Sequence, residues 1–386
     1  MQAIFQTMLS IKVFLQNRKY FAPAFLYSCF SLVFSTWVIY IPYIAEKMQI
    51  TEGKVGGALF FTSLGSFVTI PLSNKLTDIL GVGRQSFIGF VLYALSMYGM
   101  FLAPDYLWLC VALFFFGVMS SIFAIALNSL VVTIEKQAGK YIMTGSHGFW
   151  SIGGIIGAST GGYIAGKLGM PLVHISLLVV ILIGLQIWLR KEYTHITGDV
   201  RVKGKKEKFP VKPLLAIAAI AMIMMASEGA IADWSALYLK KVVVMKSHLL
   251  GFGYALFSAG MTLGRFTGDA MSHRFGSWKL LRIAITTSLV GFSLVLMVHP
   301  FLVLPGFFII GLGFSIIVPE VYRLASNVKG VRTADGISFL AASTNVGFLT
   351  GPVLLGFIAE LQSLYMSFLV LAAFVTLALG MTFLKR

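Results

Sequence analysis

The sequence predicts an all-α membrane protein with twelve transmembrane helices in two pseudo-symmetric bundles of six. Three observations lead to this fold class: the composition, the spacing of apolar runs, and a glycine pattern that recurs half a chain later. Only 11% of the 386 residues are Asp, Glu, Lys or Arg, against roughly 25% in soluble proteins, and 58% are hydrophobic. Because one core cannot bury so much apolar surface, a lipid bilayer must solvate most of the chain.

Apolar stretches of about 20 residues, the length that crosses a ~30 Å hydrocarbon core, occur twelve times. Twelve spans place both chain ends on the same side of the membrane. The expected spans lie near residues 20–45, 54–73, 86–103, 106–134, 142–165, 171–189, 214–239, 249–271, 278–298, 300–325, 335–358 and 363–384.

The distribution of basic residues indicates the orientation, since cytoplasmic loops carry an excess of Lys and Arg. Of the 30 basic residues, 22 fall at the chain ends and in loops on one side, and six fall on the other. The remaining two, Arg265 and Arg323, lie inside spans. We therefore expect both termini to be cytoplasmic. The net charge of +16 is divided among short clusters, which argues against a nucleic-acid partner.

Glycines recur at an offset of 194 or 195 residues, about half the chain, and such repeats are typical of transporter folds. We expect residues 1–190 to form an N-terminal six-helix bundle, 191–212 a basic cytoplasmic linker, and 213–386 a C-terminal six-helix bundle. The matching pairs are Gly56 with Gly251, Gly65 with Gly260, Gly81 with Gly276, Gly117 with Gly311, Gly153 with Gly347, Gly157 with Gly351, and Gly162 with Gly356.

Two segments carry a resemblance to a known family. The segment from Asn74 to Arg84 reads NKLTDILGVGR, similar to the Gly-x-x-x-Asp-x-x-Gly-x-x-Arg/Lys signature of the major facilitator superfamily, with Asn74 where glycine is usual. Its second copy has His273 at the aspartate position. The seventh span contains EGAIADWSALYL, starting at Glu228, and resembles that of a group of poorly characterised bacterial facilitators. The resemblance covers essentially the whole chain, and it implies a transporter in a bacterial cytoplasmic (inner) membrane.

Glu228 and Asp233 interrupt the otherwise apolar seventh span. An ionisable side chain in hydrocarbon costs a few kcal/mol or more unless it faces water or a partner, so these acids require a reason to be there. We predict that Glu228 accepts and releases a coupling proton, with Asp233 as the second candidate. A static hydrogen bond or a helix-capping role is the alternative for both.

Charged residues in the eighth and tenth spans lie at helical spacing, four apart in one pair and three apart in the other. The family resemblance assigns a gating role to the loop after the second span, and we predict that all these charges form one cytoplasmic latch. The alternative is mutual neutralisation of local pairs. The predicted latch comprises Asp78, Gly81, Arg84, Arg265, Asp269, Glu320 and Arg323.

A substrate cavity is expected near the midplane, where transporters of this architecture bind their substrates. His147, Trp150 and Asn345 lie there on the matching spans 5 and 11. Tryptophan offers a stacking face to a sugar or an aromatic ligand, and asparagine offers both donors and acceptors. His147 could instead hydrogen-bond a neighbouring span. Trp37 and Trp234, near the outer ends of spans 1 and 7, are candidates for gate plugs or interfacial anchors.

Small residues in spans 5 and 11 allow helices to approach one another closely. We expect Gly153, Gly157, Gly347 and Gly351 to serve helix packing. The resemblance implies that these two spans meet spans 8 and 2 across the interface between the halves.

A secondary transporter explains these features better than a passive channel or an intramembrane enzyme. No catalytic constellation, metal-ligand spacing or phosphate-binding loop is present in the sequence, so we expect no enzyme activity, no metal and no cofactor. The favoured function is proton-coupled movement of a small polar or sugar-like solute by a monomer embedded in the bilayer. Proton-driven efflux of amphiphilic, drug-like compounds is the alternative. The substrate, the direction of transport and the coupling ion stay open.

Overall fold

A computed structural model describes residues 14–139, 142–168, 170–198, 211–328, 331 and 333–383. These ranges are helical and contain no strand. Nine of their helices are long and apolar enough to cross a membrane, as expected for a multi-pass membrane protein. The chain divides into two compact units, which are described separately below. Unit 1 comprises Met1–Gln49 with Ala58–Lys203, and unit 2 comprises Ile50–Gly57 with Gly204–Arg386.

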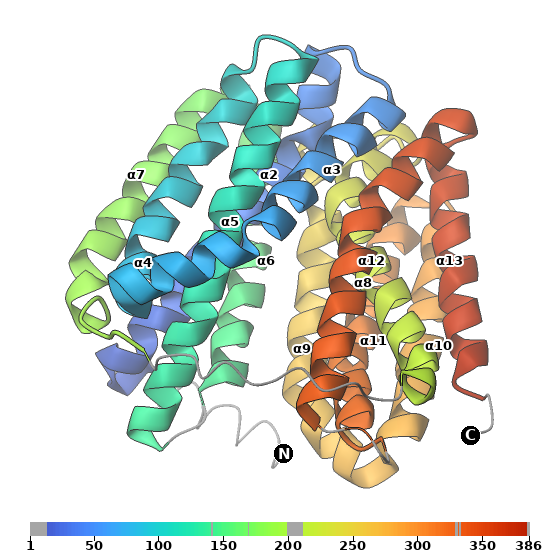
Figure 1. Ribbon diagram of the computed structural model, residues 1–386. Helices are drawn as coiled ribbons and strands as arrows, with labels where there is room; N and C mark the ends of the chain where they lie inside the picture. Colours follow the sequence, from blue (N-terminus) through green and yellow to red (C-terminus); the bar gives the residue numbers. More distant parts are fainter. Residues whose placement is uncertain are drawn as a thin grey trace. The chain divides into compact units, whose positions relative to one another are not determined.

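Six α-helices occupy the first half of the chain (Figure 1). Local signals explain several of their starts: the side chains of Asn17 and Asp105 accept hydrogen bonds from backbone N–H groups at the first turns of α2 and α5, and Pro171 opens α7. The helices are α2 (Arg18–Lys47), α3 (Glu52–Val68), α4 (Ile70–Leu102), α5 (Tyr106–Ala138), α6 (Met143–Leu168) and α7 (Pro171–Leu189).

Within unit 1, α2 packs along α6 and α4 packs along α5. Aromatic side chains fill the space between them. Phe30 of α2 contacts Tyr93 of α4 and Phe123 of α5, with ring centroids 5.0 and 4.9 Å apart. All three side chains are buried. Aromatic burial of this kind is a large contribution to the packing of the unit.

Six further α-helices follow in the second half. Within unit 2, α8 packs along α12, while α11 packs along both α9 and α10. The helices are α8 (Leu215–Lys241), α9 (Phe252–Phe275), α10 (Ser277–Leu296), α11 (Pro300–Ser326), α12 (Thr333–Leu361) and α13 (Leu364–Met381). Three of the twelve expected spans fall on α3, α6 and α9, which are not among the nine helices that meet the length and hydropathy requirements for a span.

The segment that separates the second and third expected spans is helical on both sides of one glycine. Helix α4 continues through Gly81, which alone is non-helical there, with φ of 74° and ψ of 157°. At the matching position of the second half, Gly276 separates α9 from α10 with φ of 74° and ψ of 154°. Only glycine adopts this conformation without steric cost, so the repeat seen in the sequence reproduces the same local turn.

The repeat also extends to the packing partners of the glycines. A Cβ atom placed on Gly117 would lie 1.9 Å from the carbonyl oxygen of Thr62, and one placed on Gly311 would lie 2.0 Å from that of Phe257. These two partners are themselves 195 residues apart. The same helix pair is therefore packed in the same way in each unit.

Candidate functional site

A charged cluster lies between α8 and α9 of unit 2. Glu228 is at the middle of α8, about 20 Å from either end at a rise of about 1.5 Å per residue, and it is partly exposed. It interacts electrostatically with Arg265 of α9. Tyr254, also on α9, is buried, interacts with both charges and with Asp233, and has a side-chain hydrogen bond with Ser258. An acid at the middle of α8 and a base on α9 thus influence each other electrostatically.

The next turn of α8 is more deeply buried. Asp233 is 7% exposed, and the side chains of Trp234 and Ser235 are fully buried. Among the described residues, the indole Nε1 of Trp234 and the Oγ of Ser235 have no hydrogen-bond partner. Full burial does not fit Trp234 as an anchor at the lipid–water interface, where the ring would face outward. Trp37 of α2, 3% exposed, is likewise buried.

A second charge pair of unit 2 joins two helices. Arg323 Nη1 donates to Glu320 Oε1 at 2.7 Å within α11, and also donates to the hydroxyl of Ser272 on α9. Glu320 is 2% exposed, and its other oxygen has no partner among the described residues. The expected spacing of three therefore does form an ion pair. The side chain of Asp269 lies outside the described residues, so its predicted pairing with Arg265 is untested.

Asp78 and Arg84, which flank the Gly81 turn in unit 1, are both exposed. Neither forms an ion pair with another described residue. The turn is held by backbone contacts instead: the N–H groups of Val82 and Gly83 donate to the carbonyls of Thr197 and Ile196, at 3.2 and 2.9 Å. The chain that follows α7 therefore docks on the segment from Asn74 to Arg84. Because backbone groups make this contact, no side-chain pattern in the sequence predicts it.

His147 takes part in a polar and aromatic group in unit 1. Its ring centroid lies 4.8 Å from that of Tyr27 on α2. The hydroxyl of Tyr27 donates to Asn128 Oδ1 of α5 at 2.5 Å and lies 3.7 Å from the sulfur of Met143. His147 and Asn128 are partly exposed. Tyr27 and Asn128 were not predicted from the sequence, because other polar residues lie along both helices and no spacing distinguishes these two.

Trp150 lies one helical turn further along α6. Its ring stacks edge-on against Phe30 at a centroid distance of 4.6 Å and lies 6.3 Å from Phe34. Both Trp150 and Phe34 are partly exposed. On α12 of unit 2, Asn345 is exposed and has no side-chain hydrogen bond to another described residue. The group around His147 and the Asn345 side chain thus belong to different units.

The predicted packing glycines contact the first helix of their own unit. A Cβ on Gly153 would lie 2.1 Å from the carbonyl oxygen of Ser28 on α2, and one on Gly347 would lie 2.2 Å from that of Met222 on α8. Gly157 and Gly351 likewise face α2 and α8. These contacts with spans 1 and 7 were not expected.

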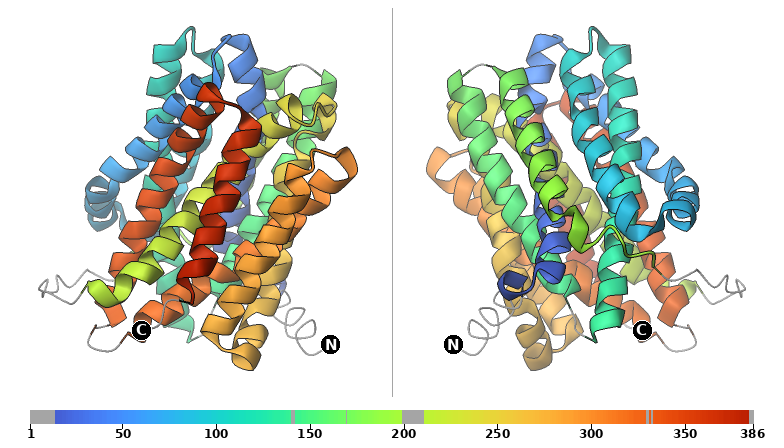
Figure 2. Two further views of the ribbon diagram at one scale, coloured as in Figure 1. Left: turned by 90° about the vertical axis from the view of Figure 1, so that its right-hand side faces the viewer. Right: turned by 90° about the vertical axis from the view of Figure 1, so that its left-hand side faces the viewer.

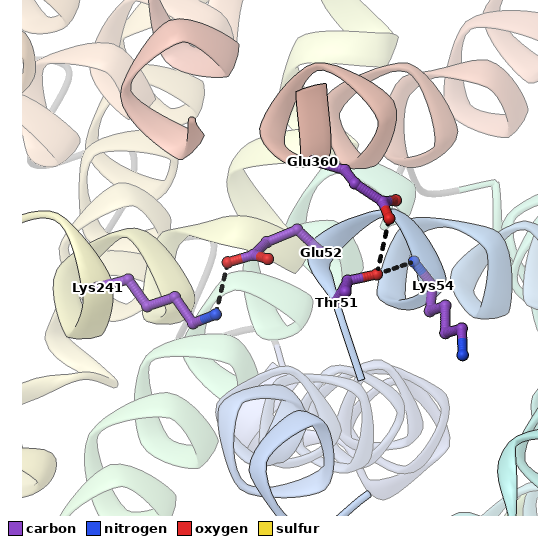
Figure 3. A network of polar contacts seen from close by, with 5 residues as sticks. All are labelled: Thr51, Glu52, Lys54, Lys241 and Glu360. Carbon is purple, nitrogen blue, oxygen red and sulfur yellow. Dashed lines mark hydrogen bonds and ion pairs between the residues drawn. The ribbon is translucent and has the colours of Figure 1, made fainter. Parts of the chain in front are cut away.

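A polar network holds the start of α3 within unit 2 (Figure 3). Lys241 Nζ lies 2.5 Å from Glu52 Oε1, and the hydroxyl of Thr51 donates to Glu360 Oε1 at 3.1 Å. Beside it, Gly56 and Gly356 approach so closely that a Cβ on Gly56 would be 2.9 Å from the Cα of Gly356. The ends of α8 and α12 are therefore tied to residues 50–57.

No group of three or more potential metal ligands occurs in the part of the chain that the structure describes. The polar residues of this part form small clusters between helices. Two helical units with charges inside long apolar helices are typical of membrane transporters.

The chain belongs to the Major Facilitator Superfamily, whose family model matches residues 24–334 and 247–386. An uncharacterized transporter of Sinorhizobium fredii is 28% identical over 354 residues, covering 90% of this chain and 92% of the relative. An uncharacterized MFS-type transporter of Yersinia pestis is 29% identical, covering 86% and 87%. Among solved structures, that of a mutant of the nucleoside transporter NupG has a TM-score of 0.75 at 15% identity, covering 95% of this chain and 99% of that chain. This last likeness shows the fold.

Proposed function

We propose that this protein moves a small polar or sugar-like solute across a bacterial inner membrane by proton-coupled secondary transport, with Glu228 as the proton carrier. Membership of the Major Facilitator Superfamily supports secondary transport. The observation that carries the coupling is the position of Glu228, a partly exposed acidic residue at the middle of α8. A carboxyl group reached by water at that depth can exchange a proton.

Arg265 supplies a switch for this exchange because it interacts electrostatically with Glu228. When Glu228 is ionised, the two charges neutralise each other, and the pair is tolerated in the membrane. When Glu228 is protonated, its attraction to Arg265 is lost. Tyr254 interacts with both groups and is therefore exposed to the same change. Protonation therefore changes the electrostatics of α8 and α9 together.

The substrate class is proposed from the group around His147. Tyr27, Asn128 and His147 offer a hydroxyl, an amide and an imidazole, which can exchange hydrogen bonds with hydroxyl groups or ring nitrogens of a solute. Trp150 adds a ring face on the same helix as His147, suitable for stacking. Nucleosides and monosaccharides both combine hydroxyl groups with a flat or semi-apolar ring face. We propose that such solutes, rather than large amphiphilic compounds, are carried.

The first experiment identifies a solute. The purified protein is heated with a panel of monosaccharides, nucleosides and amphiphilic drugs, because a ligand of the folded state raises its melting temperature. Hits are then tested in proteoliposomes that contain a pH-sensitive dye, with and without an imposed proton gradient. Solute-induced proton movement into the vesicles supports symport. A response to the amphiphilic compounds alone, with protons moving in the opposite direction, would establish efflux instead.

The second experiment tests the proton carrier. Glu228→Gln keeps the shape and most hydrogen bonds of the side chain but cannot ionise. We expect it to abolish gradient-driven accumulation while preserving the thermal shift by the solute and exchange of labelled for unlabelled solute. Asp233→Asn, the same change five residues along the helix, is the matched control and should be milder. Full proton-driven transport by Glu228→Gln would refute the assignment.

Arg265→Gln separates a coupling role from a static ion pair. If the pair only stabilises the fold, Glu228→Gln and Arg265→Gln should lower the melting temperature alike and impair transport in proportion. If Glu228 carries the proton, Arg265→Gln should instead change the pH dependence of transport, because the acid loses its counter-charge.

A further inference from the structure

The start of α2 and the end of α7 lie near one another in unit 1 (Figure 2), and four basic residues are found there. Arg18 and Lys19 begin α2, and Arg190 and Lys191 open the short 3₁₀ helix η1 (Arg190–Glu192) that follows α7. All four side chains are exposed. Helix α2 contacts both α7 and η1, so the four charges lie in one region.

Aromatic rings hold the two guanidinium groups of this region. The Cζ atom of Arg18 lies 5.2 Å from the ring centroid of Trp188, and that of Arg190 lies 5.9 Å from the ring of Phe87 on α4. Such cation–π contacts orient the guanidinium plane and leave its edge N–H groups available. Arg18 and Arg190 are therefore presented as two preoriented donors.

No described side chain neutralises the positive charge of this region. Arg18, Lys19, Arg190 and Lys191 form no ion pair with another described residue, and Glu192, the acid of η1, forms none either. Basic residues in the first turn of a helix also oppose the helix dipole, which favours negative charge there. An external anion would relieve both the repulsion among these charges and the conflict with the dipole.

The surface beside these charges is apolar. Trp188 is 61% exposed, as expected for a ring at the boundary between hydrocarbon and water. Further along α7, Leu177, Val180 and Ile181 are 57–68% exposed. A continuous apolar helix face thus begins directly beside the basic side chains, an arrangement that matches a molecule with an anionic head and hydrocarbon tails.

We propose that the ends of α2 and α7 form a binding site for an anionic phospholipid. Arg18 and Arg190 donate to the phosphate oxygens of the headgroup, and Lys19 and Lys191 add charge. The acyl chains lie along the exposed apolar face of α7. None of these residues is a proposed substrate or coupling residue. The lipid site can therefore be tested separately from the transport proposal.

The test measures the melting temperature of the full-length protein in detergent during titration with cardiolipin, phosphatidylglycerol or phosphatidylcholine. We expect the two anionic lipids to raise the melting temperature at lower concentration than phosphatidylcholine. For Arg18→Gln with Arg190→Gln, the apparent affinity for cardiolipin should fall about 30-fold, the effect of two cationic contacts. The matched control is Arg274→Gln with Lys279→Gln, which removes the same charge from two cations that stack on Phe275. This control should keep the cardiolipin response.

Two further measurements keep the proposal falsifiable if the double variant is unstable. Inorganic phosphate at matched concentration should not raise the melting temperature. A rise in melting temperature equal to that with cardiolipin would mean that the site binds soluble anions instead. Trp188 fluorescence, isolated by subtracting Trp188→Phe, should be quenched more by brominated phosphatidylglycerol than by brominated phosphatidylcholine in mixed nanodiscs. Equal quenching of Trp188 by the two brominated lipids would overturn the proposal. So would a loss of the cardiolipin response in the control variant equal to that in the double variant.

Discussion

Lys241 Nζ and Glu52 Oε1 lie 2.5 Å apart and join the end of α8 to the first turn of α3. The two side chains are 46% and 21% exposed, so water screens their attraction. The pair is accompanied by the Thr51–Glu360 hydrogen bond (Figure 3), and both contacts hold the same short segment within unit 2. Their combined role is therefore to position the first turn of α3.

The first prediction concerns the strength of this ion pair. We expect a double-mutant cycle of Glu52→Gln and Lys241→Gln to give a coupling free energy of about 1 kcal/mol or less, as for other partly exposed pairs. Denaturant unfolding of the purified protein would measure it. The charge-exchanged variant Glu52→Lys with Lys241→Glu should recover most of the coupling. A coupling of several kcal/mol would show that the pair is desolvated.

The second prediction concerns helix packing. Gly153→Ala should destabilise the protein by about 1–3 kcal/mol, because its Cβ would lie 2.1 Å from a backbone oxygen that cannot rotate away. Gly347→Ala should cost a similar amount, since the contact recurs in unit 2. Gly184→Ala on α7 is the control: nothing lies within 4 Å of its Cβ, and it should be neutral or slightly stabilising. Equal melting temperatures for all three variants would contradict this account.

The third prediction compares the two glycines that have positive φ at matching positions. Gly276→Ala should cost about 1–3 kcal/mol, the strain of an extended, positive-φ backbone that is essentially confined to glycine, because its Cβ meets open space. Gly81→Ala should cost more, since its Cβ would also lie 2.9 Å from the Cα of Thr197. Melting temperatures of the two single variants test the order. A larger loss for Gly276→Ala would mean that residues 196 and 197 move aside at little energetic cost.

The fourth prediction concerns membrane orientation. Cysteine at position 195 should be protected from an impermeant thiol reagent in intact cells, whereas cysteine at position 247 should react, because the distribution of basic residues predicts that residue 195 is cytoplasmic. His195 and Ser247 are both exposed, and the native Cys29 and Cys110 are buried, so background labelling should be low. The opposite pattern would invert the predicted topology. The loop around Lys205 lies outside the described residues.

Periodic features of the sequence predicted the helices well. Hydropathy located the long apolar helices, and the glycine offset anticipated that Gly81 and Gly276 have the same backbone conformation. The boundaries near Gly81 were less accurate, because hydropathy falls wherever polar residues enter a helix. Residues 74–80 therefore read as a loop although they continue α4.

The side-chain clusters were harder to predict because they join helices that are distant in sequence. Glu228 was expected to stand alone in its helix, and no periodicity within α8 indicates that Arg265 of α9 interacts with it. Tyr27 and Asn128 are separated by 101 residues. By contrast, Glu320 and Arg323 share one helix, and their pairing followed from their spacing.

The latch proposed for Asp78 and Arg84 stays a prediction. The resemblance supplied the role, whereas the described structure shows both side chains exposed and without an ion pair. In this structure the segment is held by the backbone of residues 196 and 197. The backbone contact and the predicted latch do not conflict. The backbone of the turn is docked on residues 196 and 197, while the Asp78 and Arg84 side chains lie on its surface.

The contact between Gly153 and Ser28 has an evolutionary consequence. Gly153 recurs at position 347, but Ser28 is matched by Met222, a residue of different size and polarity. The glycine faces a carbonyl oxygen, and every residue type carries one. The glycine contact itself therefore places no requirement on the partner's side chain, and the bond that the Ser28 hydroxyl donates to the carbonyl of Phe149 on α6 is an addition specific to unit 1. Between the two halves the residue opposite accordingly differs, while the glycine and the carbonyl that it faces recur.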